Sequence, residues 1–92
     1  MQQEIAETQA LTILAWLTGD EELLPLFMGA TGTGEDDIRA RADEPEFLAS
    51  VLDFLLMDDQ WVLKASEGTD IPAQNFQMIR AGLPGGAVPD WT

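Results

Sequence analysis

The stretch that most constrains this chain is residues 46–57, EFLASVLDFLLM. At about 100° per residue in a helix, its apolar side chains cover an arc of roughly 200°, about twice the arc of an ordinary surface helix. These side chains are Phe47, Leu48, Val51, Leu52, Phe54, Leu55 and Leu56. So broad an apolar face needs partners on most sides. The pattern therefore predicts a central helix over about residues 44–57, around which the rest of the chain packs.

Other segments have apolar residues at helical spacing and predict shorter helices around the central one. We expect these helices at residues 3–17, 20–28, 35–42, 58–66 and 72–81. In the first, Leu11 lies off the predicted apolar face, whereas Ile5 lies on it. In the second, Pro25 predicts either a kink or a new helical turn. The sequence thus predicts an all-α fold, a compact bundle of five to six short helices.

Caps and stops follow from the residues at the ends of these segments. Aspartates precede several predicted helices and are candidate N-caps, namely Asp20, Asp43 and Asp70, while Asp58 is expected to begin its helix. Gly19 and Gly68 are candidate stops, since glycine often ends a helix in the left-handed conformation. The expected core joins the central helix to the helices that contain Trp16, Phe27, Ile38, Trp61 and Phe76.

The C-terminal residues differ in composition from the helical part. Residues 83–92, LPGGAVPDWT, contain two prolines, two glycines and a lone tryptophan. We expect a single helical domain over residues 1–82 and a flexible, disordered tail over residues 83–92. For Trp91 three interpretations are open: it folds back on the domain, it has no role, or it acts as a short linear ligand.

The chain is strongly acidic. Seventeen Asp and Glu residues against four Lys and Arg residues give a formal net charge of −13 and a pI near 4.1. Such a surface repels phosphate backbones and anionic headgroups, so we expect no nucleic acid and no membrane among the partners. The acidity serves either solubility or attraction to a basic protein partner.

Several features favour residence in the cytoplasm. The chain has no cysteine, which excludes disulfides and fits a reducing compartment. The first ten residues, MQQEIAETQA, carry two glutamates and no basic residue, which is the wrong charge for a secretory signal. No apolar run approaches the roughly 18 residues of a membrane span.

The chain lacks histidine, cysteine and tyrosine, so the commonest catalytic bases and nucleophiles are missing. Catalysis would fall to carboxylates, the threonines, Ser50, Ser66 or Lys64. The glycine-rich run 29–34 has no following lysine and predicts no nucleotide site, and no acidic run has EF-hand spacing. We therefore expect a protein that is not an enzyme, with no catalytic residues, no cofactor and no metal site.

Several short strings together resemble a small bacterial family of unknown function, whose members are short, acidic and helical. The strings are residues 22–27, Thr31-Gly32, residues 36–42, residues 45–56, Asp58-Asp59 and residues 81–85. The resemblance covers roughly residues 4–86, so it leaves Trp91 outside. It implies a single compact domain in the cytoplasm and supplies no site residues.

These observations favour a noncatalytic protein-protein interaction module with an acidic surface, as a monomer or weak homo-oligomer. The first alternative is a homo-oligomeric structural domain that Leu11 and Met57 close through a symmetric interface. A remote alternative is an enzyme that uses carboxylates, which requires a cleft lined by at least two acids.

Overall fold

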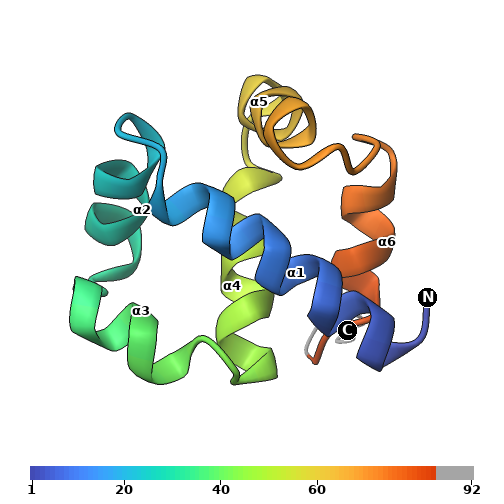
Figure 1. The fold of residues 1–92 in the computed structure, drawn as a ribbon, viewed down its shortest axis with the longest axis horizontal. Coiled ribbons are helices and arrows are strands. Elements are labelled where there is room, and N and C mark those ends of the chain that lie inside the picture. The colour runs from blue at the N-terminus through green and yellow to red at the C-terminus, as the bar shows by residue number, and fades with distance from the viewer. Residues whose placement is uncertain (85–92) are drawn as a thin grey trace, which may run out of the picture.

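The structure is a computed structural model that describes residues 1–84. Within this range the chain forms six helices and no strand, which confirms the predicted all-α class. The helices are α1 (Gln3–Thr18), α2 (Leu23–Thr31), α3 (Glu35–Arg41), α4 (Pro45–Leu55), α5 (Asp59–Thr69) and α6 (Asn75–Ala81) (Figure 1).

The α4 helix is the predicted central helix, and it shares the centre of the domain with α1. Its buried residues are Phe47, Leu48, Ala49, Val51, Leu52, Phe54 and Leu55. The α1 helix crosses α4, and both helices pack against α2, α5 and α6 (Figure 1). The core is therefore built on a crossed pair, because α1 also buries a full stripe of apolar side chains: Ala6, Ala10, Ile13, Leu14 and Leu17.

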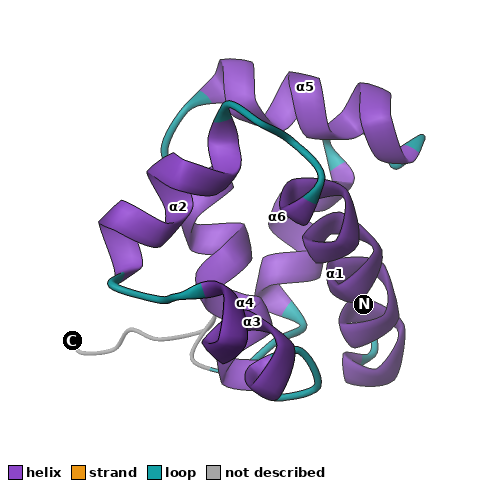
Figure 2. Cartoon of the chain, turned by 60° about the vertical axis from the view of Figure 1, so that its left-hand side comes forward, coloured by secondary structure: helices purple, strands orange, loops and turns teal. Residues whose placement is uncertain are grey.

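The remaining helices cover this pair from different ends. The α5 helix lies across one end of the domain and α3 lies toward the other (Figures 1 and 2). The α3 helix is peripheral and buries only Ile38. Because α3 is short and carries five charged residues out of seven, it has little apolar surface to contribute to the core.

An aromatic chain runs through the core from α2 to α5. The ring of Phe27 meets Phe47 and Phe54 edge to face, with ring centroids 6.0 and 5.3 Å away. Phe54 in turn stacks on Trp61 of α5 at 4.6 Å. Such pairs add roughly 0.5–1.5 kcal/mol each beyond the burial of their apolar area. These ring contacts set the positions of α2 and α5 relative to α4.

The start and end of α2 differ from the sequence prediction. Pro25 neither kinks a helix nor begins one, because α2 starts at Leu23 and Pro25 falls in its first turn, where a missing N–H is harmless. The helix also continues through Gly29 to Thr31, and Gly32 closes it with a φ of 71°. By contrast, Gly19 follows α1 with a φ of −95°, so it is not in the predicted left-handed conformation.

Of the three predicted aspartate caps, Asp20 is confirmed and Asp43 and Asp70 are wrong, while Asp58, expected as the first residue of its helix, is a cap instead. Asp58 accepts a hydrogen bond from the N–H of Gln60 and caps α5, and Asp20 accepts from two N–H groups at the start of α2. The residue before α4 is Glu44, so Asp43 lies outside the cap position. Asp70 ends α5 with a φ of 61° instead of starting α6, which begins at Asn75. Gly68 is not a stop, because α5 continues to Thr69.

Leu83, the first residue of the segment expected as a tail, is 3% exposed and belongs to the core. Ile5, by contrast, was expected inward and is exposed. Residues 85–92, including Trp91, lie outside the described residues, so the three interpretations of Trp91 stay predictions.

Candidate functional site

The basic side chains of this protein all contact carboxylates of the same chain. Arg39, Arg41, Lys64 and Arg80 each lie within salt-bridge distance of at least one acid. Residues 1–84 hold sixteen of the seventeen acidic side chains, all except Asp90. Five of these sixteen contact a basic side chain, which leaves eleven with no basic side chain at that distance in the described part. The surface field is therefore almost purely negative.

Two basic side chains, Lys64 and Arg80, connect elements that lie far apart in the chain. The Lys64 ammonium of α5 lies 2.7 Å from Glu22 and 3.2 Å from Asp20 of the α1–α2 turn. Hydrogen bonds to Glu22 and Asp20 raise the pKa of Lys64 above its ordinary value. Burial alone would raise the pKa of Asp20, but the N–H of Leu23, the Lys64 ammonium and the N–H of Glu22 together lower it. These charges hold α5 against the start of α2.

Arg80 makes the second connection. Its guanidinium of α6 donates two hydrogen bonds to the Asp53 carboxylate of α4, one of them 3.2 Å long. It also donates to the carbonyl of Pro84 at 3.2 Å. The bidentate geometry is the one that arginine and carboxylate prefer. Arg80 therefore ties the end of the described chain to α4.

The two arginines of α3 make local contacts. Arg39 lies 3.9 Å from Asp36, and both side chains are exposed. Arg41 pairs with Glu44 at 3.2 Å. The Arg41 guanidinium also lies 5.1 Å from the centre of the Phe47 ring, within cation–π range. Within residues 1–84, Arg39 is 82% exposed and makes only this long contact, whereas Arg41 is held by Glu44 and by the Phe47 ring.

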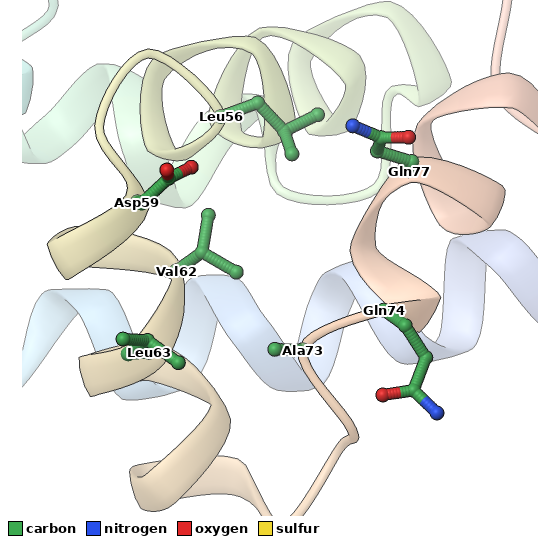
Figure 3. Close-up of a pocket in the computed structure, with 7 residues that line it drawn as sticks. All are labelled: Leu56, Asp59, Val62, Leu63, Ala73, Gln74 and Gln77. Atoms are coloured by element: carbon green, nitrogen blue, oxygen red, sulfur yellow. The ribbon is translucent and has the colours of Figure 1, made fainter.

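A groove of about 490 Å³ lies between α5 and α6 (Figure 3). Its walls come from the end of α4, from α5 and from the segment that leads into α6. The lining residues are Leu56, Asp59, Val62, Leu63, Ala73, Gln74 and Gln77. Leu63 is 49% exposed at its edge. This α5–α6 groove is mainly apolar and carries a single charged side chain.

A second groove, of about 310 Å³, lies between α1 and the turn from α3 to α4. Leu11, Ala42 and Leu48 provide its apolar surface, and Glu4, Glu7 and Asp43 provide its charges, together with Thr8. Leu11 is 46% exposed, whereas Leu48 is buried. None of the lining residues is basic. We call this the acidic groove.

Only part of the acidic groove could be predicted from the sequence. Glu4, Glu7 and Leu11 follow one another at positions i, i+3 and i+7, so they share one face of α1. That face was visible from the sequence, and Leu11 was correctly placed off the buried stripe. Asp43 and Leu48 join it only because the α3–α4 turn folds against α1, and no local pattern indicates that contact.

One known protein family matches the part of the chain that forms this fold and both grooves. A family model described as "Protein of unknown function (DUF3572)" matches residues 3–86. The chain belongs to the DUF3572 family. This confirms the resemblance to a family of unknown function, and the match includes all six helices and both grooves. No curated protein and no solved structure matches this DUF3572 member.

Ser50, Ser66 and Lys64, three of the candidate catalytic residues of this DUF3572 domain, each bond to a neighbouring group. Ser50 Oγ donates to the carbonyl of Phe47 at 2.6 Å, and Ser66 Oγ donates to the carbonyl of Ile71 at 2.6 Å. Lys64 is engaged by its two carboxylates. Within residues 1–84, no group of three or more acidic side chains is arranged to hold a metal ion.

None of the helices in the described part of this DUF3572 domain combines the length and the apolar character needed to cross a bilayer.

Proposed function

We propose that this DUF3572 domain is a noncatalytic protein-binding module that uses its acidic surface to bind a basic protein partner. One observation carries the proposal: every basic side chain is already engaged by a carboxylate of the same chain, while eleven described carboxylates have no such partner. The domain thus has much more charge available for a basic surface than for an acidic one.

The physical consequences of such a surface are well defined. A uniformly negative field steers a basic partner toward the domain and raises the association rate, and salt screens that attraction over about 10 Å at 0.1 M. Individual exposed ion pairs contribute only about 0.2–1 kcal/mol each. Useful affinity therefore requires several such pairs together with some apolar contact.

The noncatalytic part of the proposal is supported by composition and by local bonding. The chain has no histidine, cysteine or tyrosine. The pKa shifts of Asp20 and Lys64 arise within one ion cluster at the start of α2. Structural ion clusters that join two elements perturb pKa values without a catalytic role. The lack of cysteine also fits our proposal of a cytoplasmic protein.

The alternative is a homo-oligomeric structural domain closed through Leu11 and Met57. Both side chains are exposed, which supports some contact with another molecule. However, Leu11 lies in the acidic groove, so a symmetric interface there would bring carboxylates of two copies together. Sedimentation velocity at tens of micromolar separates the two proposals, because a monomer at that concentration removes the oligomer.

The proposed function is tested by retention of proteins from bacterial cytosol on the immobilised full chain, followed by titration calorimetry with each purified candidate. The control is an unrelated acidic domain of similar net charge. We expect a partner with a basic surface that the control does not retain and whose Kd increases with ionic strength. A partner without basic character, or no partner beyond those of the control, would contradict the proposal.

A further inference from the structure

We infer that the acidic groove is the docking site of the basic partner, and that it takes a segment with one apolar side chain between basic residues. This inference rests on the proposed function and adds the place on the fold and the chemistry of the bound segment.

The floor of the groove is suited to one apolar side chain. Leu11 stands half exposed on α1, and the buried Leu48 and half-buried Ala42 continue the apolar surface on the opposite wall. A volume of about 310 Å³ is at the lower end of the range for small ligand sites, and it matches a few side chains better than a whole helix face. Covering Leu11 removes apolar area from water and favours binding.

The walls carry carboxylates on both sides of that floor. Glu4 and Glu7 come from α1, and Asp43 comes from the α3–α4 turn. The amide of Gln3 donates to Glu7 Oε2 at 2.8 Å, which orients this carboxylate without neutralising it. Basic residues on either side of a bound apolar side chain would therefore meet a carboxylate on each wall.

The nearest basic residue in the sequence does not neutralise the groove. Arg41 precedes Ala42, but its guanidinium contacts Glu44 and the Phe47 ring. No basic side chain lines the groove. The negative charge there is thus available to a partner, and this charge complementarity selects a basic segment over a second copy of this acidic chain.

The α5–α6 groove is larger but gives no comparable indication of its occupant. It has one carboxylate, Asp59, and a rim of neutral glutamines, so its charge selects no partner. It does provide a matched control, because Leu63 at its edge is 49% exposed and Leu11 is 46% exposed. Substitutions at the two leucines should perturb the folded state to a similar, small extent.

The probe is a short fluorescent peptide with one leucine between two pairs of arginines, and a second peptide has alanine in place of that leucine. Anisotropy gives the affinities, and ¹H–¹⁵N spectra of the labelled full chain locate the contact. We expect shifts concentrated at residues 4–11 and 42–48, and tighter binding of the leucine peptide. Leu11→Lys should weaken binding about tenfold or more, whereas Leu63→Lys should change it less than about twofold.

The charges are tested by a second matched pair of variants. Glu7→Gln combined with Asp43→Asn should weaken binding about two- to thirtyfold, because two exposed ion pairs are lost. The control combines Glu67→Gln with Asp59→Asn on α5 and changes the net charge by the same amount. It should weaken binding only slightly, through the smaller overall negative charge of the domain.

The outcomes separate the inference from the proposed function. If Leu63→Lys weakened binding and Leu11→Lys did not, the inference about the acidic groove would be overturned. The proposal of a basic partner would still stand. Equal effects of both variants, with no preference for leucine, would also overturn it, because the contact would then be general charge attraction. If no basic peptide binds at low salt and no basic partner is retained from cytosol, both proposals are overturned.

Discussion

Gly68 of α5 lies directly against the indole ring of Trp16 on α1. A methyl group at position 68 would overlap Nε1 and Cδ1 of the ring and would come within 2.9 Å of Cε2. Gly68 is inside a helix, with no positive φ to explain the absence of a side chain. The reason for a glycine here is the close approach of two helices. This contact sets how near α5 lies to α1.

We predict that Gly68→Ala destabilises the domain even though alanine is the better helix former. Overpacking of a close contact costs about 1–3 kcal/mol, so the loss exceeds the gain of about 0.5–1 kcal/mol in helix propensity. Gly29→Ala is the matched control, because a Cβ at this helical position in α2 meets no atom within 4 Å. It should stabilise the domain by about 0.5–1 kcal/mol. Urea denaturation measures both, and equal behaviour of the two variants would contradict the Gly68–Trp16 contact.

Phe27 should be among the costliest residues to truncate. Its side chain is fully buried, and its ring contacts both Phe47 and Phe54. Phe27→Ala leaves a cavity at the junction of α2 and α4 and should lower the free energy of unfolding by about 3–5 kcal/mol. That is a large part of the roughly 5–15 kcal/mol typical of a domain. The neighbouring Leu26 is exposed, so Leu26→Ala should cost less than about 0.5 kcal/mol. Chemical denaturation of both variants measures these losses of stability. Equal losses would show that α2 does not pack on α4 through Phe27.

The Asp20 ion cluster should make stability depend on pH in the acid range. Because the pKa of Asp20 is lower in the folded state than its ordinary value of 3.8, its contribution is complete above about pH 4. It decreases as the pH falls through the folded-state pKa. Asp20→Asn keeps an acceptor for the N–H of Leu23 but removes the charge next to Lys64.

Thermal denaturation of Asp20→Asn and the wild type over a pH series tests this. The variant should be less stable by about 0.5–1 kcal/mol at neutral pH, and the difference should shrink below about pH 4. Glu67→Gln serves as the control, since Glu67 is exposed and has no basic partner. A difference that stays constant down to strongly acid pH would show that charge is not the cause.

Arg80 and Asp53 should be energetically coupled, in contrast to Arg39 and Asp36. Arg80 is 17% exposed and makes two hydrogen bonds to Asp53, whereas Arg39 is 82% exposed and lies 3.9 Å from Asp36. Double-mutant cycles with Gln at the arginines and Asn at the aspartates measure the coupling. We expect about 0.5–1 kcal/mol for the first pair and about 0–0.3 kcal/mol for the second. The larger coupling should decrease in high salt, and a reversed order would rule out the tertiary role of Arg80.

Sequence patterns predicted well those features that depend on local periodicity. The breadth of the apolar face over residues 46–57 indicated that α4 is surrounded, and the structure buries all but one of the apolar residues on which the prediction rested. The helix starts and ends were less accurate. Asp43, Gly68 and Asp70 have the right residue types for a cap or a stop, but each of these types also occurs for other reasons.

The acidic groove was only partly predictable from the sequence, because local patterns do not indicate which elements pack together. Exposure of Leu11 followed from its angle on the first helix, and the excess of acid followed from composition. The meeting of Leu11 with Leu48 and Asp43 required the packing of α1 against the α3–α4 turn.

The sequence by itself determined the helical class, the central helix and the negative charge of this DUF3572 domain, because helical period, apolar burial and ionisation are properties of nearby residues. Tertiary structure alone decided that Gly68 accommodates Trp16, that Lys64 and Arg80 bridge helices, and that three carboxylates surround Leu11. Those relations join residues far apart in the chain. They depend on which helix faces pack together, and this is set by the summed burial of the whole core.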